Sequence, residues 1–203
     1  MKLLITGASS TLGKNLTSEL LKTGNYSIRL LQHHSPIKIE NCETFKSDIQ
    51  NIDGLTKACS GIDAVIHLAA LIGIPYSYYS PLAYLKTNME GTYNILESVK
   101  NNKKKKLIVT STSEVYGSAD YIPIDETHPL KPQSPYSASK IAADNLALSY
   151  YHSFKTPVII LRPFNTFGPR QSERAIIPTI INQILRSKNN TIFLGNLYPK
   201  REF

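Results

Sequence analysis

Two short stretches of the chain carry side chains that can move protons. Thr112 and Glu114 follow the apolar, β-branched run 106–110, which predicts a buried parallel strand and places both residues just beyond a strand end. Tyr136 and Lys140 are four residues apart and would share one face of a helix. An ammonium group near a phenol lowers the pKa of the tyrosine, which makes Tyr136 a candidate general base. The same spacing would also suit a buried tyrosine beside a solvated lysine.

A glycine-rich turn near the N-terminus favours the catalytic interpretation. Residues 2–6 predict a first strand, and the amphipathic segment that follows Gly13 predicts a helix to about residue 23. Glycines in such a turn let the backbone approach a pyrophosphate at the helix N-terminus. Ser10 stands at the middle glycine position, where a side chain makes that approach less free. The turn predicts bound NAD(P), with these ligands: Gly7, Ser9, Ser10, Thr11, Leu12 and Gly13.

Further cofactor contacts are expected where later strands end. The predicted second strand, 27–31, is followed by Gln32 and two histidines, without the acidic residue that usually holds the adenosine ribose of NAD. Arg29 and the histidines would equally tolerate the phosphate of NADP, so the choice of cofactor stays open. Asp48 either hydrogen-bonds the adenine or caps the next helix. The other expected cofactor ligands are Ile49, Leu68, Ala69, Ala70 and Asn88.

Strand and helix patterns alternate along the whole chain, which predicts a doubly wound parallel sheet of the Rossmann type. His67, inside the fourth predicted strand, is expected to pack rather than to bind a ligand. The hydroxyl-rich segment 73–81 is expected to be a loop, followed by a long helix. Residues 1–170 are expected to form the dinucleotide-binding domain with the catalytic residues, and 171–203 the beginning of a smaller substrate-binding lobe.

Composition narrows the class of protein. Hydrophobic residues make up 41% of the 203 residues and charged residues 19%, as in a globular domain. No apolar run reaches about 18 residues, and the N-terminus enters a strand without room for a signal peptide. We therefore expect no membrane partner. Cys42 and Cys59 have no metal or redox spacing, so we expect free thiols in a reducing cytoplasm and no metal site.

The formal net charge of +8 raises the question of a nucleic-acid partner. Part of this charge lies in the run 100–106, between a predicted helix and a predicted strand, which is typical of a solvated connection. No aromatic residues interleave with the run, and no nucleic-acid-binding motif is present. We therefore expect no nucleic-acid partner and an attraction for anionic small molecules instead.

Taken in order, the motifs resemble the extended short-chain dehydrogenases/reductases, and among them the NAD-dependent epimerase/dehydratase family that acts on nucleotide sugars. The Thr112-Ser113-Glu114 triplet occurs in nucleotide-sugar 4,6-dehydratases and in UDP-glucuronate decarboxylases. The segments 73–78 and 172–178 look most like the dehydratases of legionaminic-acid-type sugar synthesis. The matching motifs are Thr6-Gly7-Ala8…Gly13, His67-Leu68-Ala69-Ala70, Thr87-Asn88…Gly91-Thr92, 112–117, Tyr136…Lys140 and Arg162-Pro163-Phe164-Asn165…Gly168-Pro169.

The resemblance implies a role for each catalytic residue. Tyr136 would take the proton of the sugar 4-hydroxyl while the nicotinamide takes the C4 hydride, and Thr112 would hydrogen-bond that hydroxyl. Tyr136 and Lys140 would also contact the cofactor, and Lys140 would hold the nicotinamide ribose and depress the tyrosine pKa. Glu114 would remove the C5 proton as the 6-hydroxyl leaves as water. The hydride would return to C6, so that NAD(P), with NAD preferred, is regenerated.

The chain departs from the family pattern at two places. The dTDP-glucose enzymes carry an aspartic acid as the general acid where this chain has Ser113, so the acid is left undetermined. The chain also stops inside what resembles an Arg-Asp-Phe segment, so we expect a C-terminal truncation of the substrate lobe. The residues expected to contact the nucleotide sugar are Tyr78, Asn165, Arg174 and Arg201; each arginine would equally suit a surface salt bridge.

These implications favour a 4,6-dehydratase acting on an NDP-N-acetylhexosamine. The alternatives are a 4-epimerase, which would leave Glu114 without this role, a UDP-glucuronate decarboxylase, and a catalytically silent cofactor-binding remnant. The expected partner is the nucleotide-sugar substrate, and a homodimer is left open as the assembly.

Overall fold

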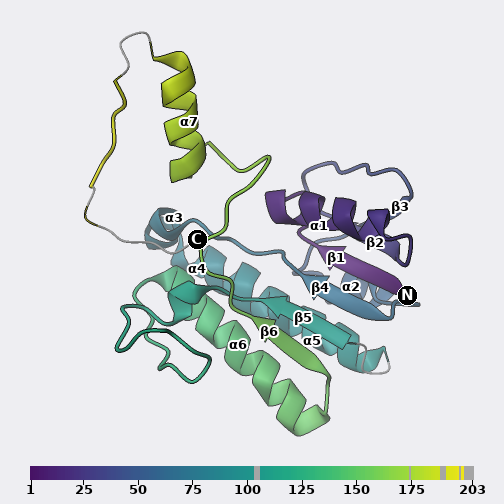
Figure 1. Ribbon diagram of the computed structural model, residues 1–203. Helices are drawn as coiled ribbons and strands as arrows, with labels where there is room; N and C mark the ends of the chain where they lie inside the picture. The colour runs from purple at the N-terminus through teal and green to yellow at the C-terminus, as the bar shows by residue number, and fades with distance from the viewer. Residues whose placement is uncertain (103–105, 174, 188–190, 197, 199–203) are drawn as a thin grey trace. The chain divides into compact units, whose positions relative to one another are not determined.

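The computed structural model describes residues 1–102, 106–173, 175–187, 191–196 and 198, and the chain divides into two compact units, Met1–Pro163 and Phe164–Phe203. The first unit is built on a parallel sheet of six strands in the order β3-β2-β1-β4-β5-β6 (Figure 1). This arrangement confirms the predicted fold class. The strands are β1 (Lys2–Thr6), β2 (Ser27–Gln32), β3 (Cys42–Lys46), β4 (Ala64–His67), β5 (Lys106–Thr110) and β6 (Val158–Leu161).

Helices connect the strands of the first unit, except that β2 runs to β3 without one. The π-helix η1 runs directly into α5, so the long helix expected from Tyr84 contains a stretch of π geometry, which is often found at functional sites. The helices of the first unit are α1 (Thr11–Lys22), α2 (Ile52–Ala58), α3 (Ile74–Tyr79), α4 (Pro81–Tyr84), η1 (Leu85–Glu90), α5 (Gly91–Asn101), the 3₁₀ turn η2 (Ser113–Val115) and α6 (Pro135–Phe154); the second unit contains α7 (Ile176–Arg186).

The segment 73–81 is helical, so the expectation of a loop there was wrong. Prolines stand in the first turns of α3 and α4, where a missing N–H costs no intrahelical hydrogen bond. The Ser77 hydroxyl is buried and donates to the Ile74 carbonyl at 2.6 Å. The hydroxyls of this segment are thus compatible with two short helices, which are separated by the non-helical Ser80.

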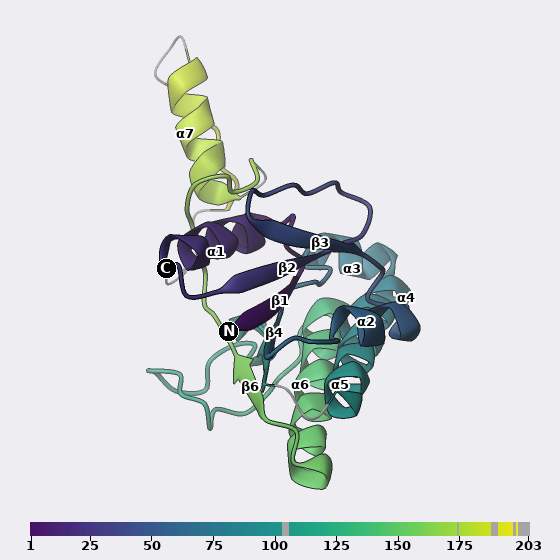
Figure 2. The same ribbon diagram turned by 90° about the vertical axis from the view of Figure 1, so that its right-hand side faces the viewer.

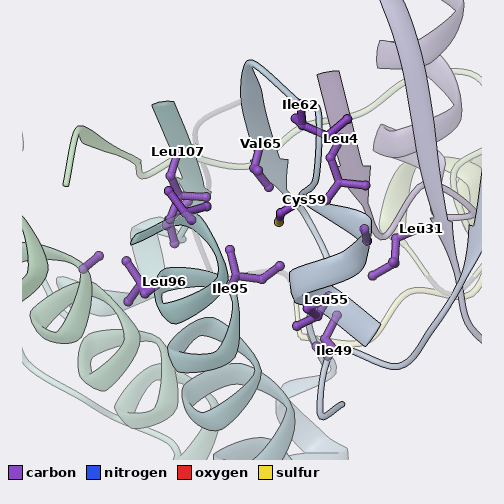
Figure 3. Packing of buried hydrophobic residues seen from close by; sticks show 14 of the residues in the cluster. Leu4, Leu31, Ile49, Leu55, Cys59, Ile62, Val65, Ile95, Leu96 and Leu107 are labelled. Carbon is purple, nitrogen blue, oxygen red and sulfur yellow. The ribbon is translucent and has the colours of Figure 1, made fainter. Parts of the chain in front are cut away.

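The two faces of the sheet bury different clusters, because successive residues of a strand point to opposite sides. Leu4 packs with α2, α5 and α6, in a cluster that includes Leu55, Ile95 and Leu107 (Figure 3). Ile5 packs on the other face, in a cluster that includes Leu20 and Leu21 of α1. Figure 2 shows α1 on one side of the sheet and α2, α5 and α6 on the other. In the described part of the chain, no helix combines the length and apolar composition needed to cross a bilayer.

Candidate active site

The predicted catalytic side chains lie beyond the carboxyl end of β5 and at the start of α6. A reciprocal cap fixes that start: Ser134 Oγ accepts from the Ser137 N–H, and Ser137 Oγ accepts from the Ser134 N–H, both at 3.0 Å. Tyr136 thereby lies in the first helical turn with its ring buried, and Lys140 is buried one turn later on the same face. The four-residue spacing therefore gives the shared helix face predicted from the sequence.

The structure brings Thr112 and Glu114 together with Tyr136. Thr112 Oγ1 accepts from the Glu114 N–H at 3.2 Å, which holds both residues in the turn η2. Burial raises the pKa of the Tyr136 phenol, the hydrogen bond with Thr112 lowers it, and the nearby negative charge of Glu114 raises it. In the described part of the chain, no ion pair engages Glu114, so the carboxylate is not explained as a partner of a surface lysine. A hydroxyl, a carboxylate and a phenol thus meet at one place beyond β5.

Lys140 does not act on Tyr136 as expected. Its Nζ donates to the Thr110 carbonyl at 2.6 Å, at the end of β5. Burial lowers the pKa of Lys140 to about 8, against the opposing charge of Asp144. The expected lowering of the Tyr136 pKa by Lys140 is therefore wrong for this structure, because burial dominates and the pKa of the phenol is raised.

Lys140 lies near a buried ion pair between Asp144 and Arg162. Asp144, one further turn along α6, is fully buried and accepts from Arg162 Nε at 2.9 Å. Arg162 also donates from Nη1 to the Tyr116 hydroxyl at 3.2 Å. Sequence reasoning missed Asp144, although its place four residues after Lys140 is a signal for the same helix face. A buried carboxylate without a partner would lower the free energy of unfolding, so loss of Arg162 would leave Asp144 destabilising the fold.

The glycines of the N-terminal turn serve contacts within the protein. Gly7 has φ +66°, and a Cβ there would lie 2.7 Å from the Ala69 nitrogen at the end of β4. A Cβ on Gly13 would lie 2.5 Å from the Gly7 carbonyl oxygen. The backbone just beyond β4 thus fills the space that a side chain on Gly7 would need, so this position requires glycine for packing, and the approach of a pyrophosphate to the turn stays a prediction. Ser10 is the N-cap of α1, and its Oγ accepts from the Gly13 N–H at 3.0 Å.

This contact gives a stability prediction. Gly7→Ala and Gly24→Ala both place a side chain at positive φ, which costs about 1–2 kcal/mol. A Cβ on Gly24 meets nothing within 4 Å, whereas one on Gly7 meets backbone. We expect Gly7→Ala to lower the free energy of unfolding by about 1–3 kcal/mol more than Gly24→Ala. Urea unfolding of both variants measures the difference, and equal losses would contradict the close approach.

The residues expected to contact the adenosine of the cofactor lie where β2 and β3 end. Asp48 Oδ2 lies 3.1 Å from His33 Nε2, and Asp48 Oδ1 accepts from the Gln50 N–H. Asn51, not Asp48, caps α2, so the capping alternative for Asp48 is wrong. Arg29 is not open to a phosphate, because it donates to the Ala58 and Ser60 carbonyls and pairs with Glu43.

Other predicted cofactor ligands differ in accessibility. Ile49 belongs to the hydrophobic core, whereas the residues 68–70 and Gln32 are half-buried. Asn88 is buried in η1: its Oδ1 accepts from the Leu71 N–H at 2.8 Å, and its Nδ2 donates to the Leu71 carbonyl and to Ser139 Oγ. Both amide protons of Asn88 are therefore used within the protein.

The predicted substrate residues fall in different parts of the chain. Tyr78 lies on α3 with 60% of its surface exposed. Asn165 belongs to the second unit. Arg174 and Arg201 lie outside the described residues.

His67 packs inside the sheet, as expected. Burial, with a smaller effect of the charge on Lys140, lowers its pKa from 6.5 to about 3. Below pH 6.5 the unfolded chain therefore binds a proton that the folded chain refuses. We expect the free energy of unfolding to fall as the pH drops from 6.5 toward 3, with a contribution of about 1.4 kcal/mol per pH unit from this residue. Urea unfolding across this range should show a shallower slope for His67→Gln, and an unchanged slope would contradict the neutral histidine.

Comparisons with known proteins agree on one family. A sequence profile of the NAD dependent epimerase/dehydratase family matches residues 3–203. A dTDP-D-glucose 4,6-dehydratase of Dictyostelium discoideum is 37% identical over 94% of this chain and 50% of its own length. An uncharacterized UDP-glucose epimerase of Bacillus subtilis is 31% identical over all of this chain and 68% of its own length.

Solved structures give the same picture. The dTDP-glucose 4,6-dehydratase of Streptomyces venezuelae with NAD bound has a TM-score of 0.84 at 28% identity, over 91% of this chain and 62% of its own. The UDP-N-acetylglucosamine 4-epimerase of Methanobrevibacter ruminantium has a TM-score of 0.84 at 32% identity, with the same coverage. The chain thus spans about half to two thirds of the length of these relatives.

Proposed function

The chain belongs to the NAD-dependent epimerase/dehydratase family, and on that premise we propose that it is the cofactor-binding and catalytic part of an enzyme acting on nucleotide sugars. Residues 1–170 would bind the cofactor and carry the catalytic groups, and 171–203 would begin the substrate lobe. A dehydratase and an epimerase of known structure both share the fold of this chain, which supports the proposal of a nucleotide-sugar enzyme.

The site has groups suited to NAD. The exposed Ser10 hydroxyl and the N-terminus of α1 are suited to an anionic pyrophosphate, because a helix N-terminus favours negative charge. The half-buried residues Ala69 and Ala70 offer small side chains against which a cofactor could lie, and the Lys140 ammonium lies at the end of β5, where we place the nicotinamide ribose. Bound NAD would accept a hydride from the sugar and return it later.

Within the family we propose a 4,6-dehydratase acting on an NDP-N-acetylhexosamine. The observation that carries this proposal is the association of Thr112, Glu114 and Tyr136 beyond β5. Tyr136 takes the proton of the sugar 4-hydroxyl, which Thr112 orients. Glu114 then removes the C5 proton, which becomes acidic once C4 is a ketone, and water leaves from C6. A carboxylate at this place has no task in a reaction that only oxidises and reduces C4.

A 4-epimerase is the second candidate. Ser113 favours it, because serine cannot protonate a leaving hydroxyl as readily as a carboxylic acid does. Its N–H donates to the Pro163 carbonyl at 3.0 Å, which fixes the residue but gives it no acidic group. The epimerase proposal therefore differs from the dehydratase proposal in the use made of Glu114.

Product masses separate these candidates. The protein, in a version that spans the full length of its relatives, would be incubated with a panel of UDP-, GDP- and dTDP-sugars, including N-acetylhexosamines. We expect a product lighter by one water from an N-acetylhexosamine. An unchanged mass with inverted C4 would indicate the epimerase, and loss of carbon dioxide would indicate a decarboxylase. No conversion of any sugar would contradict an enzyme of this class.

A further inference from the structure

A buried chain of hydrogen bonds crosses from β1 through β4 to α5. Thr6 Oγ1 lies 2.8 Å from His67 Nδ1, and His67 Nε2 lies 3.3 Å from Thr92 Oγ1. All three side chains are at most 2% exposed. Thr92 Oγ1 in turn donates to the Asn88 carbonyl at 2.6 Å. The chain of bonds therefore runs from the first strand to the π-helix.

The donor and the acceptor of each hydrogen bond in this series follow from the other hydrogen bonds that Thr6 and Thr92 make. Thr6 Oγ1 already accepts two backbone N–H groups, from Leu68 and Ala69, both at 3.2 Å. Its lone pairs are then used, so its proton must go to His67 Nδ1. The Thr92 hydroxyl donates its proton to the Asn88 carbonyl, so it must accept from His67 Nε2–H. Both ends require the same neutral tautomer of His67, and its lowered pKa agrees with this state.

The two amides held by Thr6 belong to the backbone at the end of β4. Leu68 N–H also donates to the Thr6 carbonyl at 3.3 Å, whereas Thr6 Oγ1 is the acceptor of Ala69 N–H among the described residues. Ala69 N is also the atom that a Cβ on Gly7 would approach within 2.7 Å. The same amide thus touches the glycine turn and the threonine hydroxyl.

We propose that Thr6, His67 and Thr92 are positioning residues that fix the Leu68–Ala69 backbone against the glycine turn, so that the cofactor meets a preformed surface. This inference rests on the proposed cofactor site and adds residues whose side chains do not touch the ligand. His67 is neutral and links Thr6 to Thr92 through its two ring nitrogens, and we call this link the relay. The orientation of the His67 ring sets the position of the Thr6 hydroxyl. The same series of hydrogen bonds extends to α6, because the Asn88 side chain accepts from the Leu71 N–H and donates to Ser139 Oγ.

The test compares matched variants of the 203-residue chain. Thr6→Val removes the hydroxyl at nearly constant shape, and Thr6→Ser restores it. Thr156→Val is the control, because Thr156 is a fully buried threonine just before β6, at the amino edge of the sheet. NAD affinity is measured by calorimetry, and the exchange rates of the Leu68 and Ala69 amides by NMR.

We expect Thr6→Val to weaken NAD binding about tenfold or more, the scale expected when a buried N–H loses its acceptor. Ala69 should exchange faster, and Leu68 less so because it keeps the Thr6 carbonyl. Thr6→Ser should recover both, and Thr156→Val should lose neither. A folded Thr6→Val protein with unaltered affinity and unaltered Ala69 exchange would overturn the proposal, and so would an equal loss of affinity in Thr156→Val.

His67 variants test the direction of the relay. An asparagine oxygen can take the place of Nδ1 and accept from Thr6, whereas a glutamine amide reaches the Nε2 position. His67→Asn should therefore bind NAD more tightly than His67→Gln, and the reverse order would overturn the assignment. In the unaltered protein, imidazole nitrogen shifts should report the Nε2–H tautomer from pH 5 to 8; a protonated Nδ1 would contradict it. If the unaltered chain binds no NAD, the proposed cofactor site fails, while Ala69 exchange and the tautomer still decide the relay.

Discussion

Replacing Tyr136 by phenylalanine is expected to lower nucleotide-sugar turnover by roughly two to four orders of magnitude, the usual effect of removing a general base. The ring would still fill its place against Tyr84, whose ring centroid lies 6.1 Å away, so the first turn of α6 should persist. NAD binding should also persist, because the turn of α1 is untouched. Steady-state rates of the full-length form, with calorimetry of NAD, measure the two effects separately.

Tyr150→Phe is the matched control. Tyr150 lies on the same helix and its hydroxyl donates to Glu97, remote from the proposed chemistry. It should keep its turnover, because its hydroxyl supports the contact between α5 and α6 only. Near-normal turnover by Tyr136→Phe would remove the phenol from the mechanism, and an equal loss in Tyr150→Phe would indicate damage to the helix.

Glu114→Gln is expected to stop the reaction after the sugar has been oxidised. The amide keeps the size of the side chain but cannot take the C5 proton, whereas Tyr136 and Thr112 remain able to act at the 4-hydroxyl. Loss of the negative charge should also ease ionisation of Tyr136, since Glu114 raises the pKa of that phenol. Single-turnover absorbance should show reduced cofactor accumulating while product formation falls by at least about a hundredfold.

The cofactor step serves as the internal control for this variant. A Glu114→Gln protein that fails to reduce cofactor has lost more than a base at C5, which would contradict the assigned role. Normal product formation would contradict it equally and would favour the epimerase.

Most of the strands could be predicted because they have a short apolar centre with β-branched residues, and the helices between most of them favour parallel pairing; β3 is largely polar and partly exposed. The spacing of Tyr136 and Lys140 likewise gave their common helix face. Three features depended on long-range contacts and could not be predicted. Lys140 binds a strand carbonyl, Gly7 faces the end of β4, and a hydrogen-bonded pair of Asn88 with Leu71 accompanies the π-helix. In each case the partner lies tens of residues away or on another element.

The segment 73–81 shows the limit of local reasoning. Its serines and prolines are typical of a loop, yet both prolines occupy first helical turns and the Ser77 hydroxyl bonds to its own helix. The Tyr84 hydroxyl also donates to the Gly73 carbonyl at 2.5 Å and links the two ends of the segment, a contact that the local pattern does not indicate.

Solvent exchange at C5 tests the central claim most directly. The full-length form, incubated in heavy water with the N-acetylhexosamine nucleotide that it converts, would be followed by NMR of the product. A 4,6-dehydratase that uses Glu114 at C5 must return a solvent deuteron to that carbon, so we predict deuterium at C5 in essentially every product molecule. A product that retains its original C5 proton would contradict the dehydratase and assign the site to chemistry at C4 alone.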